Sequence, residues 1–201
     1  MVTYSTDHGN SFGEPVNGTP PSDRPDFPAI AISPDGTDAY LTYDNFHQAW
    51  QSSTLAPPRL MRGVVRHADI AGDGAIRTFS DLHRGPDGDA RGSSQNNLAA
   101  EFLGDYNYAV ATRTYGAAVW NDVRNAADCK AIDAYRQTLA AAVTAGIAEP
   151  QDEDLPEVRN EERDKAKEEE EEPEPPAVQQ ECPAHFGNSD IYGGSYDDPT
   201  P

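Results

Sequence analysis

The sequence predicts an all-β fold, and three observations support that prediction. Short runs rich in Val, Ile, Tyr and Ala alternate apolar with polar positions, as in strands that are buried on one face. Turn residues such as Gly, Asp, Asn and Pro separate these runs at intervals of roughly ten residues. Only one segment of the chain has helical spacing. This pattern is typical of a β-sandwich, a β-barrel or a β-propeller.

The first turn lies in the run YSTDHGNSF close to the N-terminus. Asp7 can accept hydrogen bonds from the backbone N–H groups of the turn, and Gly9 can adopt a positive φ. Ser5 and Ser11 supply further short polar side chains, and Phe12 can fold back onto the sheet. These five residues therefore predict a structural turn rather than a catalytic one.

Three strand pairs follow, in residues 27–43, 60–82 and 102–124. The first is FPAIAISPDGTDAYLTY, in which a Ser-Pro-Asp-Gly-Thr turn joins two alternating runs. The second turns at Gly72 to Gly74, and the third turns at residues 113–116. Each pair is predicted to be an antiparallel hairpin.

Two of these features resemble a known family. The first turn resembles an Asp-box, the turn that repeats around sialidase-type β-propellers. The phrases LGDY at 103–106 and VWNDVRN at 119–125 resemble bacterial exo-sialidase-like Asp-box proteins, in which DIY follows soon after the arginine. Here DIYGG begins about 60 residues later, at Asp190. The resemblance covers about residues 1–124 and 187–201, and it implies that the Asp-box lies away from the catalytic face.

The resemblance divides the chain into three parts. Residues 1–125 would form β-propeller blades with the Asp-box, 126–186 an insertion, and 187–201 a final strand and tail. The strands amount to about two and a half four-stranded blades, whereas propellers usually close with four to eight. We therefore expect a C-terminal fragment of a longer, secreted protein. No signal peptide follows Met1, because the chain lacks both a charged start and an apolar run there.

The insertion begins with a segment of helical spacing, at about 129–147. Asp128 is the candidate N-cap, and the helix is expected to end near Gly146 to Pro150. The spacing of three and four residues predicts that one apolar face of the helix is buried. The residues of that face are Ile132, Tyr135, Leu139, Val143 and Ile147.

An acidic linker follows the helix, at about 149–177. Residues 149–174 hold 14 Asp and Glu against four Lys and Arg, a net −10 of the chain's −20. Such a segment buries too little apolar surface to fold, so it predicts a disordered spacer. A partner-binding or Ca²⁺-attracting tail is the alternative.

The two cysteines, Cys129 and Cys182, lie at the two ends of the insertion. A disulfide there would close the excursion, and it would indicate an oxidising compartment. The alternatives are two unrelated buried thiols or a metal pair, although no CxxC or CxxH spacing supports a metal.

The resemblance implies an active site of arginines that bind a substrate carboxylate, a tyrosine nucleophile with a glutamate, and an aspartic acid/base. Arg62, Arg66 and Glu101 are secondary candidates for these roles. The sequence favours a hydrogen-bonded turn lock for Asp122 and Arg124, and it favours turn and packing roles over catalysis for Asp105 and Tyr106. The catalytic candidates are Asp105, Tyr106, Arg113 and Arg124.

Neither a metal site nor a cofactor is predicted. The five histidines are scattered, with His67 close to Asp69, and the sequence favours a surface or turn role for them over metal binding. Ca²⁺ is an alternative at four aspartates in or near glycine-rich turns, although they lack the order of an EF-hand loop. Those aspartates are Asp69, Asp73, Asp87 and Asp89.

Two function classes follow from the resemblance. One is an exo-α-sialidase-type glycoside hydrolase when complete, of which this chain would be an inactive fragment. The other is a non-catalytic secreted propeller that binds a glycan, a glycoprotein or another protein; a complete stand-alone adaptor is a third hypothesis. A pI near 4.3 argues against nucleic acid as a partner, and no run is long enough to span a membrane.

Overall fold

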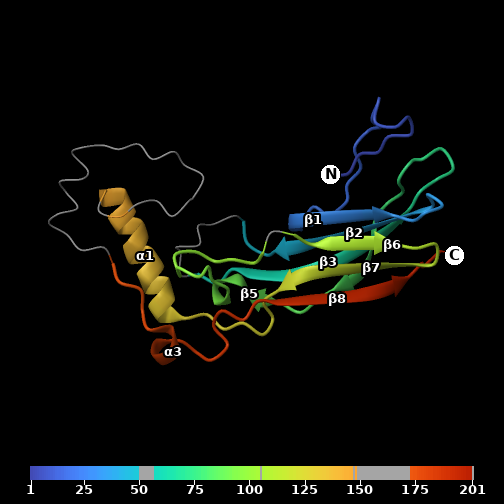
Figure 1. Cartoon of the computed structure of the whole chain (residues 1–201). Coiled ribbons are helices and arrows are strands. Elements are labelled where there is room, and N and C mark those ends of the chain that lie inside the picture. The colour runs from blue at the N-terminus through green and yellow to red at the C-terminus, as the bar shows by residue number, and fades with distance from the viewer. Residues whose placement is uncertain (50–56, 105, 147, 149–172, 201) are drawn as a thin grey trace.

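The computed structural model describes residues 1–49, 57–104, 106–146, 148 and 173–200. Two antiparallel sheets are the main regular structure among these residues, which confirms the all-β prediction. Figure 1 shows the sheets lying one on the other, with the helices gathered at one end. Most of the acidic linker lies outside the described residues.

The first sheet is a meander of four strands in chain order, and it matches the first two predicted hairpins. A short fifth strand pairs with the start of the third. Gly36 has a φ of 77° in the first turn, a conformation that glycine adopts without strain. The strands are β1 (Arg24–Ile32), β2 (Asp38–Phe46), β3 (Leu60–Asp69), β4 (Ser80–Arg84) and β5 (Gly88–Asp89).

The second sheet has the order β6 (Tyr108–Ala111), β7 (Tyr115–Asp122) and β8 (Asp190–Asp197). β7 and β8 pair along their whole length, although the predicted insertion separates them in the chain. β6 begins six residues later than the predicted run at 102–112. The residues before it form a loop that packs on the helix of the insertion.

The two sheets pack face to face through side chains that fit against glycines. The Trp120 indole on β7 covers Gly63 on β3, and the Tyr40 ring on β2 covers Gly116 on β7. Both aromatic residues are almost fully buried. Because a β-carbon at either glycine would overlap an aromatic ring, the sheets can approach this closely only where glycine stands.

The N-terminal segment makes a turn organised by Asp7. Ser11 donates to Asp7 through its backbone N–H at 2.9 Å and through its hydroxyl at 2.6 Å, and the Ser5 hydroxyl donates to it at 2.8 Å. These bonds, the Ser11 hydroxyl first, lower the pKa of Asp7 to about 2. Gly9 has a φ of 85°, as expected. Phe12 is 65% exposed, so the expectation that it folds back onto a sheet is wrong.

Only one β-bridge, Val2 with Val16, pairs the two arms of this turn, so the arms do not form extended strands. Their side chains instead pack against the face of the first sheet that points away from the second sheet. The buried residues of that face are Ala39, Leu41, Tyr43, Val64, Ala68, Ile76 and Phe79.

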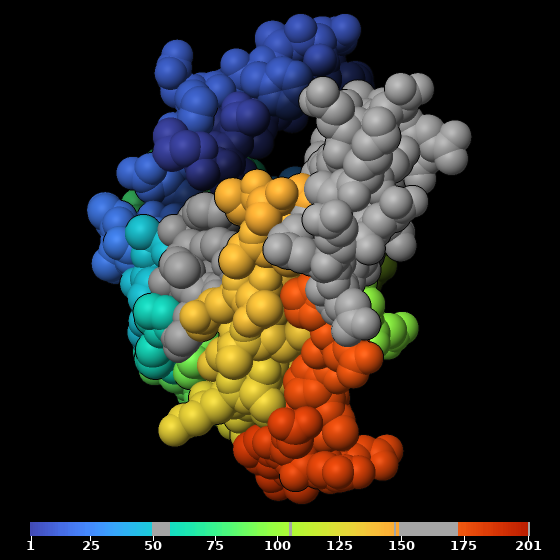
Figure 2. Space-filling view, turned by 90° about the vertical axis from the view of Figure 1, so that its left-hand side faces the viewer, coloured from blue at the N-terminus to red at the C-terminus, as the bar shows by residue number. Residues whose placement is uncertain are grey.

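The insertion carries helix α1 (Lys130–Ala145) and the short helix α3 (Val178–Glu181). A disulfide joins Cys129 to Cys182, with their Cα atoms 5.1 Å apart. The ends of the insertion are therefore held together, as predicted. Viewed from this end, α1 and the segment around α3 lie beside each other (Figure 2).

Helix α1 ends at Gly146 in the left-handed conformation, as expected, but its start differs from the prediction. Cys129 is the N-cap and makes no side-chain cap bond. Asp128 is not the cap, because its carboxylate lies 3.3 Å from the Arg91 guanidinium. Arg91 belongs to a 3-10 turn, Ala90–Gly92, at the end of the first sheet. A tertiary ion pair has thus replaced the local cap.

The buried face of α1 is partly polar. Ile132 and Leu139 are buried and Tyr135 and Val143 partly buried, as predicted, and Ile147 lies outside the described residues. Arg136 is also fully buried, which the apolar spacing did not predict. The Arg136 guanidinium donates to backbone carbonyls of the loop before β6, and thereby holds that loop against the helix. The acceptors are the carbonyl oxygens of Leu98, Ser93 and Ala100, at 3.1, 3.2 and 2.9 Å.

Candidate functional site

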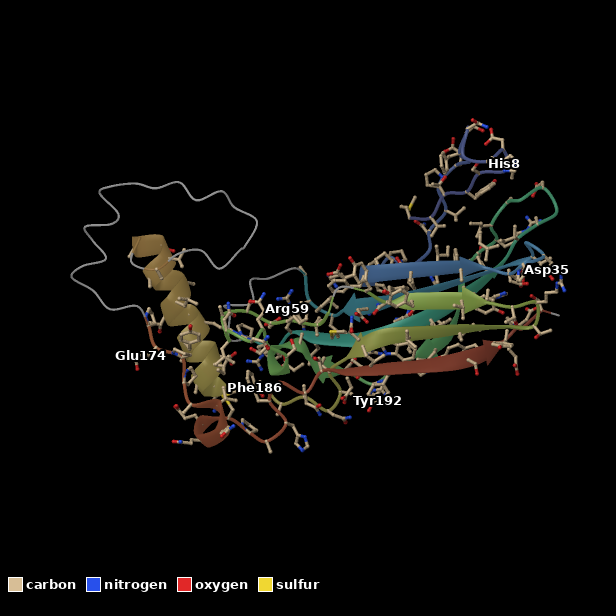
Figure 3. The ribbon with its side chains drawn as sticks, viewed as in Figure 1. His8, Asp35, Arg59, Glu174, Phe186 and Tyr192 are labelled. Carbon is tan, nitrogen blue, oxygen red and sulfur yellow. A yellow bond between two sulfur atoms is a disulfide. The ribbon has the colours of Figure 1, made fainter. Side chains whose placement is uncertain are left out.

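A cleft of about 160 Å³ opens at the end of the first sheet nearest to α1. It lies where β1 begins, β2 ends and β3 begins, so three separate segments of chain contribute to it. Figure 3 shows Arg59 at this end, with Asp35 at the opposite end of the sheets. The lining residues are Arg24, Pro25, Asp26, Phe46, Gln48, Ala49 and Arg59.

Arg24 is an exposed cation in this cleft. Its backbone N–H donates to Asn45 Oδ1 at 2.8 Å, and its Nη1 donates to the carbonyl oxygen of His47 at 2.9 Å. Within the described part of the chain, no carboxylate lies within 4 Å of its guanidinium. The rest of the planar donor fork is therefore available for an acidic ligand.

Arg59 forms the other charged wall and is already paired. Its Nη1 lies 3.0 Å from Glu101 Oε2, and its guanidinium lies over the Phe46 ring, 5.3 Å from the ring centre. Burial raises the pKa of Glu101, against the opposing effect of the Arg59 charge. Arg59 is thus held rigidly on the cleft wall, whereas Arg24 keeps unused donors.

Asp44 lies behind the cleft, between the two sheets, with no exposed surface. Neither of its carboxylate oxygens has a hydrogen-bond partner in the described part of the structure. The amide of Asn107 donates instead to the carbonyl oxygen of Phe27. Burial is the largest cause of a raised pKa for Asp44, and the negative charges of Asp122 and Asp26 raise it further. The polar side chain of Asn107 lowers this pKa, but the result is still a pKa of about 8. Asp44 is therefore protonated at neutral pH.

The predicted candidate Arg124 is locked onto a neighbouring residue. Its Nε and Nη2 donate to the two oxygens of Asp122, at 2.8 and 2.6 Å, and its guanidinium stacks over the Tyr192 ring at 3.9 Å. Its backbone N–H also donates to Asp122. This geometry matches the turn-lock alternative and leaves Arg124 little freedom to bind a substrate.

The other candidates are dispersed. Arg113 lies in the turn between β6 and β7, 3.8 Å from Asp35 at the far end of the sheets. Tyr106 lies before β6, at the end where the cleft opens, and is 70% exposed. Asp105 lies outside the described residues. The structure therefore separates Arg113 from Tyr106 by the length of a strand.

Two further arginines named from the sequence also have structural partners. Arg62 pairs with Asp87 at 2.7 Å. Arg66 is buried, pairs with Asp81 at 2.7 Å and donates to the carbonyl oxygens of Gly18 and Phe79, so it belongs to the core.

The sequence did not single out Arg24, Arg59 or Asp44. The available signals were the position of Arg24 directly before a strand and the period-two pattern that places Asp44 on the same face as Tyr40. Neither signal identifies a cleft, because the cleft depends on how distant segments meet.

A second cleft, of about 290 Å³, lies between the N-terminal segment and the first sheet. Its lining is mostly apolar and includes Val2, Ile30 and Leu41. It offers no group of converging charges, so the smaller cleft beside Arg24 is the better candidate site.

No family model, curated protein or solved structure matches this chain significantly. Among the described helices, none has the length and hydropathy needed to cross a membrane.

Proposed function

We propose that the chain is part of a sialidase-like β-propeller whose cleft beside Arg24 binds an acidic sugar. The main supporting observation is an exposed arginine with unused donors in a cleft that is also lined by a second, paired arginine and by Phe46. Arginine binds carboxylates through two parallel hydrogen bonds, and an aromatic ring provides an apolar surface for the sugar.

Three structural features support the propeller architecture. β1 to β4 form a four-stranded antiparallel meander, the form of a propeller blade, and a second sheet packs on its face. The Asp7 turn has the hydrogen bonds that an Asp-box needs. The outer face of the second sheet exposes apolar side chains that a further blade would bury. These are Tyr108, Val110, Val119 and Ile191.

Binding is better supported than hydrolysis. Asp44 carries the proton that a general acid requires, but it has no exposed surface from which to reach a glycosidic bond. Arg113 and Arg124, expected at an active site, have structural partners instead. We therefore expect no glycosidase activity from this chain alone. The disulfide fits our proposal that the protein is secreted.

Saturation-transfer NMR and calorimetry can test the binding. We expect the methyl glycoside of N-acetylneuraminic acid to bind, and the neutral sugar N-acetylmannosamine to bind at least about tenfold more weakly, because it lacks the carboxylate. Arg24→Ala should reduce the affinity for the acidic sugar by a similar factor. Arg77→Ala removes an exposed arginine outside the cleft and is the matched control.

Equal binding of both sugars, or an Arg24→Ala variant with unchanged affinity, would refute the acidic-sugar site. Hydrolysis is tested separately with a fluorogenic sialoside. Turnover above that of a boiled control would show that this chain is an enzyme and that binding alone is the wrong conclusion.

A further inference from the structure

A second group of polar side chains lies at the opposite end of the sheets from the cleft. It consists of Asp38 at the start of β2, His67 on β3 and Asp198 directly after β8. His67 Nε2 lies 2.9 Å from Asp38 Oδ1 and 3.9 Å from Asp198 Oδ1, and the three ligand atoms lie within 4.8 Å of one another. The three side chains are 5%, 3% and 9% exposed, so the expected surface role of His67 is wrong.

The strand register explains why these residues meet. His67 stands opposite Tyr40 in the β2–β3 pair, and Asp38 is two residues before Tyr40, on the same face of β2. That face points toward the second sheet. β8 ends there, and the backbone N–H of Asp198 donates to the carbonyl oxygen of Thr114 at 2.9 Å, which fixes Asp198 at the site.

Hydrogen bonds from outside orient the two carboxylates. The Thr37 hydroxyl donates to Asp38 Oδ2 at 2.5 Å, which leaves Oδ1 toward His67. The backbone N–H of Thr200 donates to Asp198 Oδ1 at 2.8 Å. Groups that position ligands in this way are typical of metal sites, because they fix the direction of each ligand atom.

The group holds two carboxylates and one imidazole, and His67 pairs with Asp38 at 2.9 Å. Throughout the described residues, no Lys or Arg lies within 4 Å of Asp38 or Asp198, and His67 is their only basic neighbour. Two largely buried carboxylates are costly unless a positive charge compensates them. A divalent cation would supply that positive charge. The carboxylates of Asp38 and Asp198, which repel each other, would then each contact the cation.

Tyr40 provides an independent observation. Its ring lies 5.0 Å from the His67 ring, and its hydroxyl is buried with no hydrogen-bond partner in the described structure. A buried hydroxyl without a partner indicates a missing water or ion.

We propose that Asp38, His67 and Asp198 bind one divalent transition-metal ion, with Zn²⁺ as the preferred ion and Tyr40 contacting a metal-bound water. One imidazole and two carboxylates are ligands that Zn²⁺ accepts, whereas Ca²⁺ takes six to eight oxygen ligands and does not select imidazole. The ion would join the segment after β8 to the first sheet, and thus hold the two sheets together at this end.

The test uses the full chain after treatment with EDTA and removal of the chelator. Calorimetry and elemental analysis should find one Zn²⁺ per chain in the presence of excess Ca²⁺ and Mg²⁺, which compete for weak sites made of carboxylates alone. Zn²⁺ should raise the melting temperature, because it binds only the folded state. Co²⁺ should give visible absorption bands typical of mixed nitrogen and oxygen ligands.

Asp198→Asn is the informative variant, because Asp198 lies at the edge of the site and its loss should leave the fold intact. We expect it to bind Zn²⁺ at least about tenfold more weakly and to lose the rise in melting temperature. Asp197→Asn removes the exposed neighbouring acid and should behave like the unmodified protein. Circular dichroism verifies that both variants fold. Absence of stoichiometric Zn²⁺ in the unmodified chain, or equal binding by Asp198→Asn, would overturn the proposal.

Discussion

Asp44 is the residue at which burial and charge conflict most directly. Its carboxyl has no exposed surface, no hydrogen-bond partner among the described residues, and two other aspartates near it. The pKa is raised from 3.8 to about 8, so the unfolded chain ionises Asp44 at a lower pH than the folded chain does. The contribution of Asp44 to stability is therefore fully present below about pH 4, and it is lost as the pH rises toward 8.

We expect Asp44→Asn to stabilise the protein at pH 8, by roughly 2–5 kcal/mol, and to have little effect near pH 4. The asparagine keeps the shape of the protonated acid and does not ionise. Urea unfolding of both proteins across this pH range measures the difference. The control is Asp35→Asn on an exposed turn, where a hydrogen bond from Ser33 lowers the carboxyl pKa, so no gain is expected. A constant difference between Asp44→Asn and the unmodified chain at all pH values would contradict the buried-acid interpretation.

At the scale of single helices and strands, the sequence predicted those features that residues close in the chain determine. The end of α1 at Gly146 was predictable, because a left-handed glycine terminates a helix without help from the rest of the fold. The start was not, because Arg91, from another segment, pairs with the expected cap Asp128. The strands were predictable from period two, but β6 began late because its first expected residues form the loop held by Arg136.

Arg136 holds the loop before β6 against α1, and its replacement tests that role. Arg136→Ala would leave three loop carbonyls without their donor and would remove a positive charge near the buried Glu101. We expect a loss of about 3 kcal/mol in the free energy of unfolding. Hydrogen exchange should accelerate in α1 and residues 93–101 before it changes in β2 and β3.

The neighbouring exposed residue supplies the control for this helix. Gln137→Ala changes a side chain of similar length that points to solvent, so its stability should stay within about 0.5 kcal/mol of the unmodified chain. If Arg136→Ala were equally mild, the loop would have to be held by the apolar contacts of Leu139 and Ala142 with Ala99 instead.

At the scale of the whole molecule, both candidate sites arise from contacts between segments that are distant in the chain. The cleft needs the start of β1 beside the start of β3, and the proposed metal site needs the end of β8 beside β2. A single sequence does not show which distant segments come into contact, so neither Arg24 nor His67 was recognised as a candidate site residue. The sequence did predict the disulfide, because Cys129 and Cys182 are the only cysteines and flank one insertion.

The packing of the two sheets gives the last prediction. A β-carbon at Gly63 would lie 2.0 Å from Trp120 Nε1, and the indole is held by its hydrogen bond to Asp122 at 3.1 Å. We expect Gly63→Ala to destabilise the protein by about 2–3 kcal/mol, because the sheets must separate or Trp120 must leave its position. Thermal unfolding with tryptophan fluorescence measures both effects.

Gly72→Ala is the matched control, because a β-carbon at Gly72 would meet no atom within 4 Å and the residue has no positive φ. It should be neutral or slightly stabilising, since alanine reduces the freedom of the unfolded chain. Trp120→Leu in the Gly63→Ala background should recover part of the lost stability, because the smaller side chain makes room for the added methyl group. If Gly63→Ala matched Gly72→Ala, then the sheets would not be in close contact at this point, and the face-to-face arrangement on which the proposed metal site depends would be wrong.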